Sequence, residues 1–242
     1  MPWDFWLIFL VLGVVLPWRG RARLRKLLAI PHVGMTERLS LYASTIAFQW
    51  IIAALVAWRA WAHGFTAEEL GLTIDGKVRV LLPGIAGTAT LGVLQWLNLR
   101  RMGRLSAAAR GLLQSLAERI FPQSRMEMLP YFALAVTAGV CEEFLYRGFA
   151  LAAIIRAGSP AWAAVVISSI LFGLAHIYQG RAGSMGTMLL GALFGTARIV
   201  YHSLVPVILW HSAVDLVAGV AGRRYLSDSV DSAPNAEMGR QL

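Results

Sequence analysis

Long apolar runs, separated by short polar or basic segments, dominate the pattern of this chain. Most of these runs approach the roughly 20 residues that an α-helix needs to cross the hydrocarbon core of a bilayer. The pattern predicts an all-α fold, a polytopic transmembrane helix bundle of about seven spans. The expected spans are Phe5–Trp18, Leu39–Trp58, Val80–Leu97, Leu129–Ile155, Pro160–Ile177, Met185–Tyr201 and Leu204–Val220.

Residues 105–128 alternate apolar and polar positions in a different way. Leu112, Leu116 and Ile120 recur at helical spacing, while Arg110 and Glu118 fall between them. This periodicity predicts an amphipathic cytoplasmic helix. The helix either lies on the membrane surface or packs under the bundle, and an eighth span hidden near 105–125 is a third interpretation.

Composition and charge support a membrane protein. Hydrophobic residues make up 57% of the 242 residues and charged residues 14%, against about 25% charged in a typical soluble domain. The net charge of +9 would suit nucleic acid, but the basic residues cluster in short segments beside apolar runs. That distribution is the positive-inside pattern of membrane proteins, and no nucleic-acid partner is expected.

The same rule predicts the orientation of the bundle. A basic run from Arg19 to Lys26 follows the first apolar run, whereas a secretory signal carries its positive charge before the apolar run. We therefore expect a retained first span whose C-terminal end faces the cytoplasm. With seven spans, the polar tail at 223–242 is also cytoplasmic, and it is expected to be disordered.

The fourth expected span carries three charges where charge is expensive, at about 2.5–3.5 kcal/mol each near a helix centre. Glu143 and Arg147 are four residues apart, so they share a helix face and can form a structural ion pair. Glu142 lies about 100° away, on the face of Tyr146, and is interpreted as the free chemical group. The alternative is that all three charges only brace helix packing. The single cysteine, Cys141, is interpreted as a small apolar filler rather than a nucleophile.

Two later spans add polar groups that a lipid-facing helix would avoid. They are His176 on the fifth span and His211 with Asp215, four residues apart, on the seventh. A carboxylate and imidazoles gathered from three helices can polarise a water and stabilise an oxyanion. At about 1.5 Å per residue, Glu142 and His211 reach similar depths in the membrane. His176 reaches that depth only if its helix continues towards Ser184, or if the site is a wide cavity open to the cytoplasm.

The pattern Glu-Glu-x-x-x-Arg, followed by Phe-x-x-x-His and His-x-x-x-Asp on later spans, resembles the CPBP family of membrane proteases. That family includes the type II CAAX prenyl endopeptidases and the bacterial bacteriocin-immunity (Abi) proteins. The resemblance covers about residues 130–220, and the turn Glu69–Leu72 is also family-like. It implies a glutamate-type intramembrane endopeptidase that needs no cofactor and cleaves a membrane-associated or lipidated peptide.

The resemblance also implies roles for single residues. Glu142 matches the general base that activates water, and His176 matches its partner at that water. His211 and Asp215 match the pair that stabilises the oxyanion, although the last position is often Asn in the eukaryotic branch. Because an ionised Asp only accepts hydrogen bonds, we expect Asp215 to orient His211 rather than to contact substrate.

On this basis the chain divides into N-terminal spans with the amphipathic helix at 1–128, a catalytic helix core at 129–222, and the tail at 223–242. The expected location is the cytoplasmic (inner) membrane of a bacterium. Prenylated C-terminal tails are one substrate class that the resemblance implies. A membrane-anchored peptide or a peptide bacteriocin suits the residues equally well.

Three other hypotheses use the same residues. A metal-dependent hydrolase would bind zinc through Glu142, His176 and His211, which are suitable ligand types, although no His-Glu-x-x-His helix is present. A non-catalytic membrane scaffold, or a bacteriocin-immunity partner, would keep the fold without the reaction. A proton-coupled transporter would use the buried carboxylates, but the sequence shows no internal repeat.

Overall fold

The computed structural model describes residues 1–226, apart from the side chains of 107–109. The described chain is helical throughout and contains no strand. Three short helical segments of other types, labelled η1 to η3, connect consecutive α-helices. The segments η1 and η2 are π-helical, and η3 is a 3₁₀ helix. The elements are α1 (Trp3–Leu10), η1 (Val11–Val15), α2 (Leu16–Ala29), α3 (Met35–Ala62), α4 (Lys77–Met102), α5 (Ala107–Ile120), α6 (Arg125–Glu143), η2 (Phe144–Ala150), α7 (Leu151–Arg156), α8 (Ala161–Ala175), η3 (Ile177–Gln179), α9 (Gly180–Tyr201) and α10 (Val205–Leu226).

Membrane-spanning length is reached by six helical segments within residues 1–226, and α8 is a shorter apolar helix. Together they coincide with the seven runs that the sequence predicts, which confirms a polytopic helical membrane bundle. The amphipathic segment forms α5, which has 14 residues and is not among the apolar helices of the described chain. An eighth span near 105–125 is therefore wrong. The six long segments are Trp3–Ala29, Met35–Ala62, Lys77–Met102, Arg125–Arg156, Ile177–Tyr201 and Val205–Leu226.

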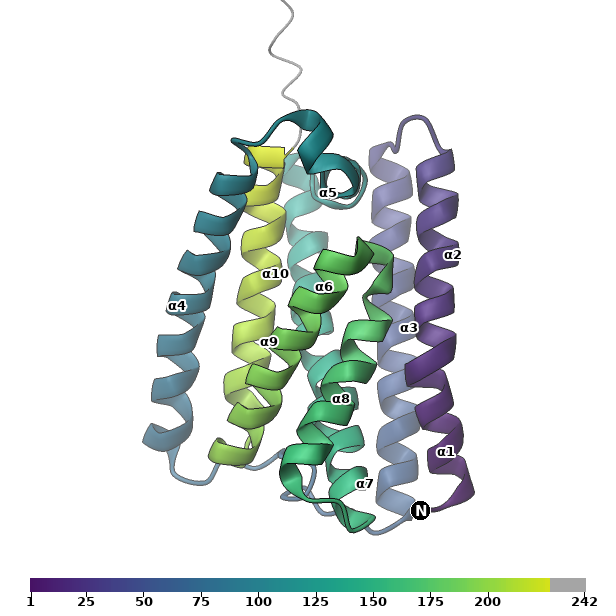
Figure 1. Ribbon diagram of the computed structural model, residues 1–242, viewed down its shortest axis with the longest axis vertical. Coiled ribbons are helices and arrows are strands. Elements are labelled where there is room, and N and C mark those ends of the chain that lie inside the picture. Colours follow the sequence, from purple (N-terminus) through teal and green to yellow (C-terminus); the bar gives the residue numbers. More distant parts are fainter. Residues whose placement is uncertain (227–242) are drawn as a thin grey trace, which may run out of the picture.

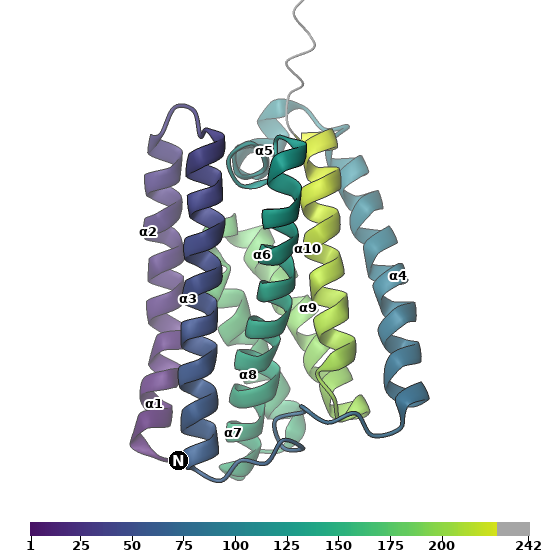
Figure 2. The same ribbon diagram turned by 180° about the vertical axis from the view of Figure 1, so that it is seen from behind.

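The helices form one row with a hairpin laid across it. In Figures 1 and 2 the row runs α4, α10, α6, α3 and then the α1–α2 rod. The α8–α9 hairpin covers one face of this row, and α9 crosses that face obliquely (Figure 1). The turn of the hairpin stops well below the level of α5 and of the α2–α3 loop. This arrangement places the hairpin turn at an intermediate height in the bundle.

The end of the bundle predicted to be cytoplasmic differs in two ways from the sequence expectation. The basic run from Arg19 to Lys26 lies beyond the expected first span, Phe5–Trp18, yet α2 continues through it as a helix to Ala29. Likewise, α10 continues to Leu226, past the boundary at 223, and the remainder of the expected disordered tail lies outside the described residues. Both helices extend beyond their apolar residues, because the hydrogen bonds within a helix also form outside the membrane.

Two buried contacts close the same end. Arg38 of α3 donates from Nε to Glu127 of α6 over 2.7 Å, and both side chains are almost fully buried. Ala117 of α5 is buried in an apolar cluster with residues of α4 and α10. Of the two interpretations of the amphipathic helix, the structure therefore shows the one in which it packs on the bundle.

A polar turn holds the opposite end. In the α3–α4 connection, Thr66 and Glu69 exchange backbone and side-chain hydrogen bonds. The buried guanidinium of Arg198, on α9, donates to the carbonyls of Glu68 and Glu69. The backbone carbonyl of Gly71 also accepts from Leu204, at the start of α10. The turn thereby fixes the corner at which α9 passes into α10.

Small residues allow the helices to approach closely at specific points. A Cβ added to Gly139 of α6 would meet Ser212 Oγ and, at 3.0 Å, the carbonyl oxygen of Ile208, both on α10. On α9, a Cβ at Gly191 would lie 2.8 Å from Arg147 Nη2, whereas one at Gly186 would meet nothing within 4 Å. On α9, Gly191 is therefore a position of close helix contact and Gly186 is not.

These contacts lead to a prediction. Gly139→Val forces side-chain atoms into α10, and overpacking of this kind costs about 1–3 kcal/mol. We expect a lower melting temperature in detergent, measured by loss of the monodisperse peak on size-exclusion chromatography after heating. Gly186→Val is the matched control and should melt like the wild type. Equal melting of the two variants would contradict the close α6–α10 contact.

Candidate active site

The four residues expected to form a site converge in the structure. Oε2 of Glu142, at the end of α6, lies 3.7 Å from Nε2 of His176 and 3.9 Å from Nε2 of His211. Oδ2 of Asp215 lies 3.6 Å from the same His211 nitrogen. His176 and His211 therefore approach the same oxygen of Glu142, although they lie 34 and 69 positions further along the chain.

His176 reaches Glu142 because its helix is short. α8 ends at Ala175, and the chain turns through η3 into α9, with Gly180 at φ 81°. Ser184 Oγ of α9 donates to the carbonyl oxygen of Gly173 over 2.6 Å, which closes the hairpin. Of the two alternatives for His176, a fifth helix that continues towards Ser184 is wrong. The turn itself lies inside the height of the bundle, so His176 meets Glu142 without a longer helix (Figure 1).

Both imidazoles present the same nitrogen to the site. Nδ1 of His176 lies 2.9 Å from the backbone carbonyl oxygen of Phe172, which can only accept, so Nδ1 carries a proton. Nδ1 of His211 lies 2.7 Å from Oε1 of Glu143, and an ionised carboxylate fixes it in the same way. In each ring the remaining nitrogen, Nε2, faces Glu142.

Glu143 and Arg147 form the ion pair that their spacing predicts. Nη1 of Arg147 donates to Oε1 of Glu143 over 3.0 Å, and both side chains are fully buried. The guanidinium carbon of Arg147 also lies 4.0 Å from the ring centre of Phe172, within cation–π range. Arg147 belongs to the π-helical segment η2, and such segments often occur at functional sites.

Two carboxylates flank the His211 ring, one beside each nitrogen. Asp215 lies beside Nε2, the nitrogen that faces the site, whereas Glu143 holds Nδ1 on the other side of the ring. The spacing along α10 identifies Asp215 as a neighbour of His211 on the same helix, but it does not identify the carboxylate that α6 supplies.

The sequence patterns did not reveal Gln49, on α3. Its Nε2 donates to Oε1 of Glu142 over 2.7 Å, across 93 positions of the chain. A single Gln inside an apolar span belongs to no recognisable spacing. Its polarity within the expected span Leu39–Trp58 is the only signal that the sequence offers.

The distances between the candidate zinc ligands can be compared with those around a bound zinc ion. Donor atoms around a tetrahedral zinc ion lie about 3.3 Å apart, given bonds of about 2.0–2.1 Å. The two imidazole nitrogens are 3.7 and 3.9 Å from Glu142 Oε2. Across the described part of the chain, no three His, Cys, Asp or Glu side chains form a group able to hold a metal ion. Each imidazole nitrogen therefore lies farther from Oε2 than two ligands of a tetrahedral zinc ion lie from each other.

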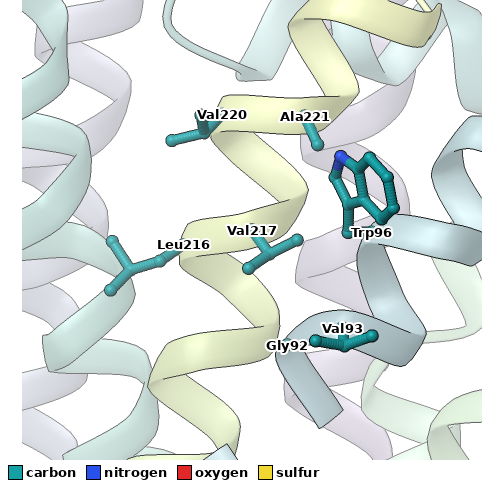
Figure 3. A pocket seen from close by; sticks show the side chains of 7 residues that line it. All are labelled: Gly92, Val93, Trp96, Leu216, Val217, Val220 and Ala221. Carbon is teal, nitrogen blue, oxygen red and sulfur yellow. The ribbon is translucent and has the colours of Figure 1, made fainter. Parts of the chain in front are cut away.

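One pocket lies beside the turn that follows His176, and another lies between α4 and α10. One, of about 520 Å³, is bordered by Arg21 and Arg25 of α2, Leu112 of α5 and Tyr178 in the turn after His176. The other, of about 370 Å³, lies between α4 and α10 and is lined by side chains such as Trp96 and Val217 (Figure 3). The first pocket joins basic and aromatic side chains, whereas the second is apolar.

Comparison with known proteins covers the part of the chain that holds the site. Residues 124–217 match the family model described as Type II CAAX prenyl endopeptidase Rce1-like. The match begins just before α6 and ends in α10, so it includes Glu142, His176, His211 and Asp215 but not Gln49. It confirms the family resemblance drawn from the motifs. No curated protein and no solved structure matches the chain.

The buried ion pair gives a prediction about stability. Glu143→Gln leaves Arg147 buried without a charged partner, and breaking a buried pair in this way costs about 3–5 kcal/mol. We expect reduced abundance in the membrane and a lower melting temperature in detergent. Glu118→Gln, on the partly exposed Glu118–Arg119 pair with its N···O distance of 4.0 Å, is the control and should change neither. A normal melting temperature for both Glu143→Gln and Arg147→Leu would refute the structural role of the pair.

Proposed function

We propose that this chain, whose residues 124–217 match the CAAX prenyl endopeptidase family, is an intramembrane endopeptidase that uses a glutamate-activated water. The observation that supports this function best is the position of Glu142. Its Oε2 is buried, accepts no hydrogen bond from the described residues, and faces Nε2 of both His176 and His211 within 4 Å. That is the arrangement a general base needs.

The proposed reaction begins with a water bound beside Glu142. Separations of 3.7 and 3.9 Å are too long for direct hydrogen bonds, and a water can hydrogen-bond to Glu142 and to an imidazole at once. Glu142 takes one proton as the water oxygen attacks the peptide carbonyl. Neutral His176, with its proton on Nδ1, accepts a second hydrogen bond from that water at Nε2. When the tetrahedral intermediate collapses, protonated Glu142 returns the proton to the leaving amine.

His211 is proposed to stabilise the oxyanion. Nε2 can donate to an oxyanion only while it carries a proton, which makes the ring an imidazolium because Nδ1 is also protonated. The carboxylates of Glu143 and Asp215, at 2.7 Å from Nδ1 and 3.6 Å from Nε2, supply the negative charge that balances this cation. Asp215 thus acts on His211 rather than on the peptide. Donors that are already placed where charge develops commonly contribute a factor of about 10²–10³ to the rate.

The proposed substrate is a membrane-associated or lipidated peptide. The site is built from membrane helices, so a substrate must reach it from the bilayer or along its surface. The 520 Å³ pocket adjoins the turn that carries His176 and is bordered by Trp18 and two arginines, which suits a peptide lying at a membrane surface. We propose no cofactor for the reaction, and the cytoplasmic membrane of a bacterium as its location.

The central prediction concerns Glu142→Gln, which keeps the size of the side chain but cannot accept the proton. We expect a folded, inserted protein whose cleavage rate falls at least 10²-fold, and comparable losses for His176→Ala and His211→Ala. Substrates can be found by mass spectrometry as membrane peptides that accumulate in cells carrying Glu142→Ala. The assay then compares wild type and Glu142→Gln on one such peptide in the same detergent.

Two results of that assay would change the mechanism. Turnover by Glu142→Gln close to wild type would remove Glu142 as the base. Wild-type cleavage that disappears after exhaustive chelation, and returns with zinc, would replace the proposed mechanism by the metal-dependent alternative. Under the proposal, wild-type cleavage survives chelation unchanged.

The proposed orientation gives a separate prediction. The end of the bundle that holds α5 and the C-terminal end of α10 is expected to face the cytoplasm, because basic residues concentrate there. A phosphatase fused after Arg224 should be inactive, whereas green fluorescent protein fused at the same position should fluoresce. The same pair of reporters inserted at Gly64, in the loop at the opposite end, should give the reverse pattern. A periplasmic signal from the Arg224 fusion would overturn the seven-span orientation.

A further inference from the structure

We propose that Gln49 is a positioning residue for Glu142, supplied by a helix outside the segment that matches the protease family; this inference rests on the proposed function. Its amide fixes which carboxylate oxygen faces the two imidazoles. Nε2 of Gln49 donates to Oε1 of Glu142 over 2.7 Å. The family match spans residues 124–217, and Gln49 lies on α3.

The two oxygens of Glu142 have different surroundings. Oε1 accepts the hydrogen bond from Gln49, while Oε2 accepts none from the described residues and faces the two Nε2 atoms. A carboxylate held only through its own chain can rotate about its last torsion angle, which has a broad preference. A donor at one oxygen stops that rotation. Gln49 therefore leaves a single oxygen in place to take the proton from water.

The chemistry of an amide suits this task. A carboxamide donates to a carboxylate but does not take a proton from it near neutral pH, so the transferred proton is directed to Oε2. The orientation of the Gln49 amide is itself constrained, because turning it over would place its oxygen against Oε1 of Glu142. A glutamate at position 49 would instead set a second carboxylate beside the base, and two such groups compete for one proton.

A neighbouring contact holds α3 in register with α6. The indole nitrogen of Trp50 donates to Oγ1 of Thr137 over 3.3 Å. Trp50 is half-exposed. Its partner Thr137 lies five residues before Glu142 on α6, so this hydrogen bond does not involve the carboxylate. Trp50→Phe therefore removes one side-chain hydrogen bond between the same two helices and leaves the one to Glu142. This makes it the matched control for changes at Gln49.

The first test measures the carboxylate directly and needs no substrate. An infrared difference spectrum between a protein and its Glu142→Gln derivative isolates the Glu142 carboxylate bands. We expect Gln49→Met, which keeps the length of the side chain but has no N–H, to shift the antisymmetric carboxylate stretch. Trp50→Phe should leave the band where it is in the wild type. An unshifted band in correctly folded Gln49→Met would overturn the proposal.

The second test measures turnover of an internally quenched farnesylated peptide in detergent. Gln49→Met should lower kcat about tenfold or more with KM within twofold of wild type, the scale on which supporting hydrogen bonds act. Trp50→Phe should keep the wild-type kcat. In the Glu142→Gln background, Gln49→Met should add no further loss, since the base it positions is gone. Equal losses in kcat for Gln49→Met and Trp50→Phe, or a full additional loss in the double variant, would assign Gln49 a purely structural role.

The two tests separate this inference from the proposed function. A wild-type protein that leaves the farnesylated peptide uncut counts against that substrate class. The peptide that accumulates with Glu142→Ala then replaces it in the same comparison. Turnover by Glu142→Gln equal to wild type refutes Glu142 as the base and, with it, any catalytic role of Gln49. A shifted carboxylate band without any change in kcat shows the contact but refutes the positioning role.

Discussion

Glu143 places one negative charge in the interior of the bundle, and two groups from different parts of the chain meet it there. Arg147, one turn later, neutralises the charge, and His211 of α10 donates to the same oxygen. Removing charges from water is costly, and only close, well-directed contacts repay that cost. Through these two contacts, Glu143 holds α6, the π-helical segment η2 and α10 in one relative position. The distance between Glu142 and His211 depends on that position, so a fully buried group sets the geometry of the site beside it.

Adjacent carboxylates thus have opposite surroundings. The Glu143 side chain is 0% exposed and is held by a cation, whereas the Glu142 side chain is 19% exposed and has a neutral amide on one oxygen. The helical rotation of about 100° per residue turns them towards different neighbours. Two consecutive glutamates therefore separate a structural charge, on Glu143, from the carboxylate of Glu142 that we propose as the base. The close approach of α6 and α10 at Gly139 brings His211, on α10, near both glutamates.

The sequence predicted those features that depend on neighbours along the chain. Apolar runs located the spans, and the four-residue spacing identified the Glu143–Arg147 pair. It did not predict the depth of His176, because that depth follows from where α8 turns into α9 and from how the hairpin lies on the row of helices. It also did not predict Gln49, whose partner is 93 positions away. Nor did it predict that Glu143 contacts Nδ1 of His211, because these two residues lie on different helices, 68 positions apart.

The short hairpin has a consequence for the surrounding lipid. At about 1.5 Å per residue, the 15 residues of α8 extend about 22 Å, while a bilayer core is about 30 Å thick. Lipids beside such a helix thin locally or bend, at a fraction of a kcal/mol per Å of mismatch. On that side of the protein, head groups and water come nearer to the turn that carries His176. The proposed hydrolysis consumes water, and hydrophobic mismatch at one short helix is a route by which water can reach the site without a pore.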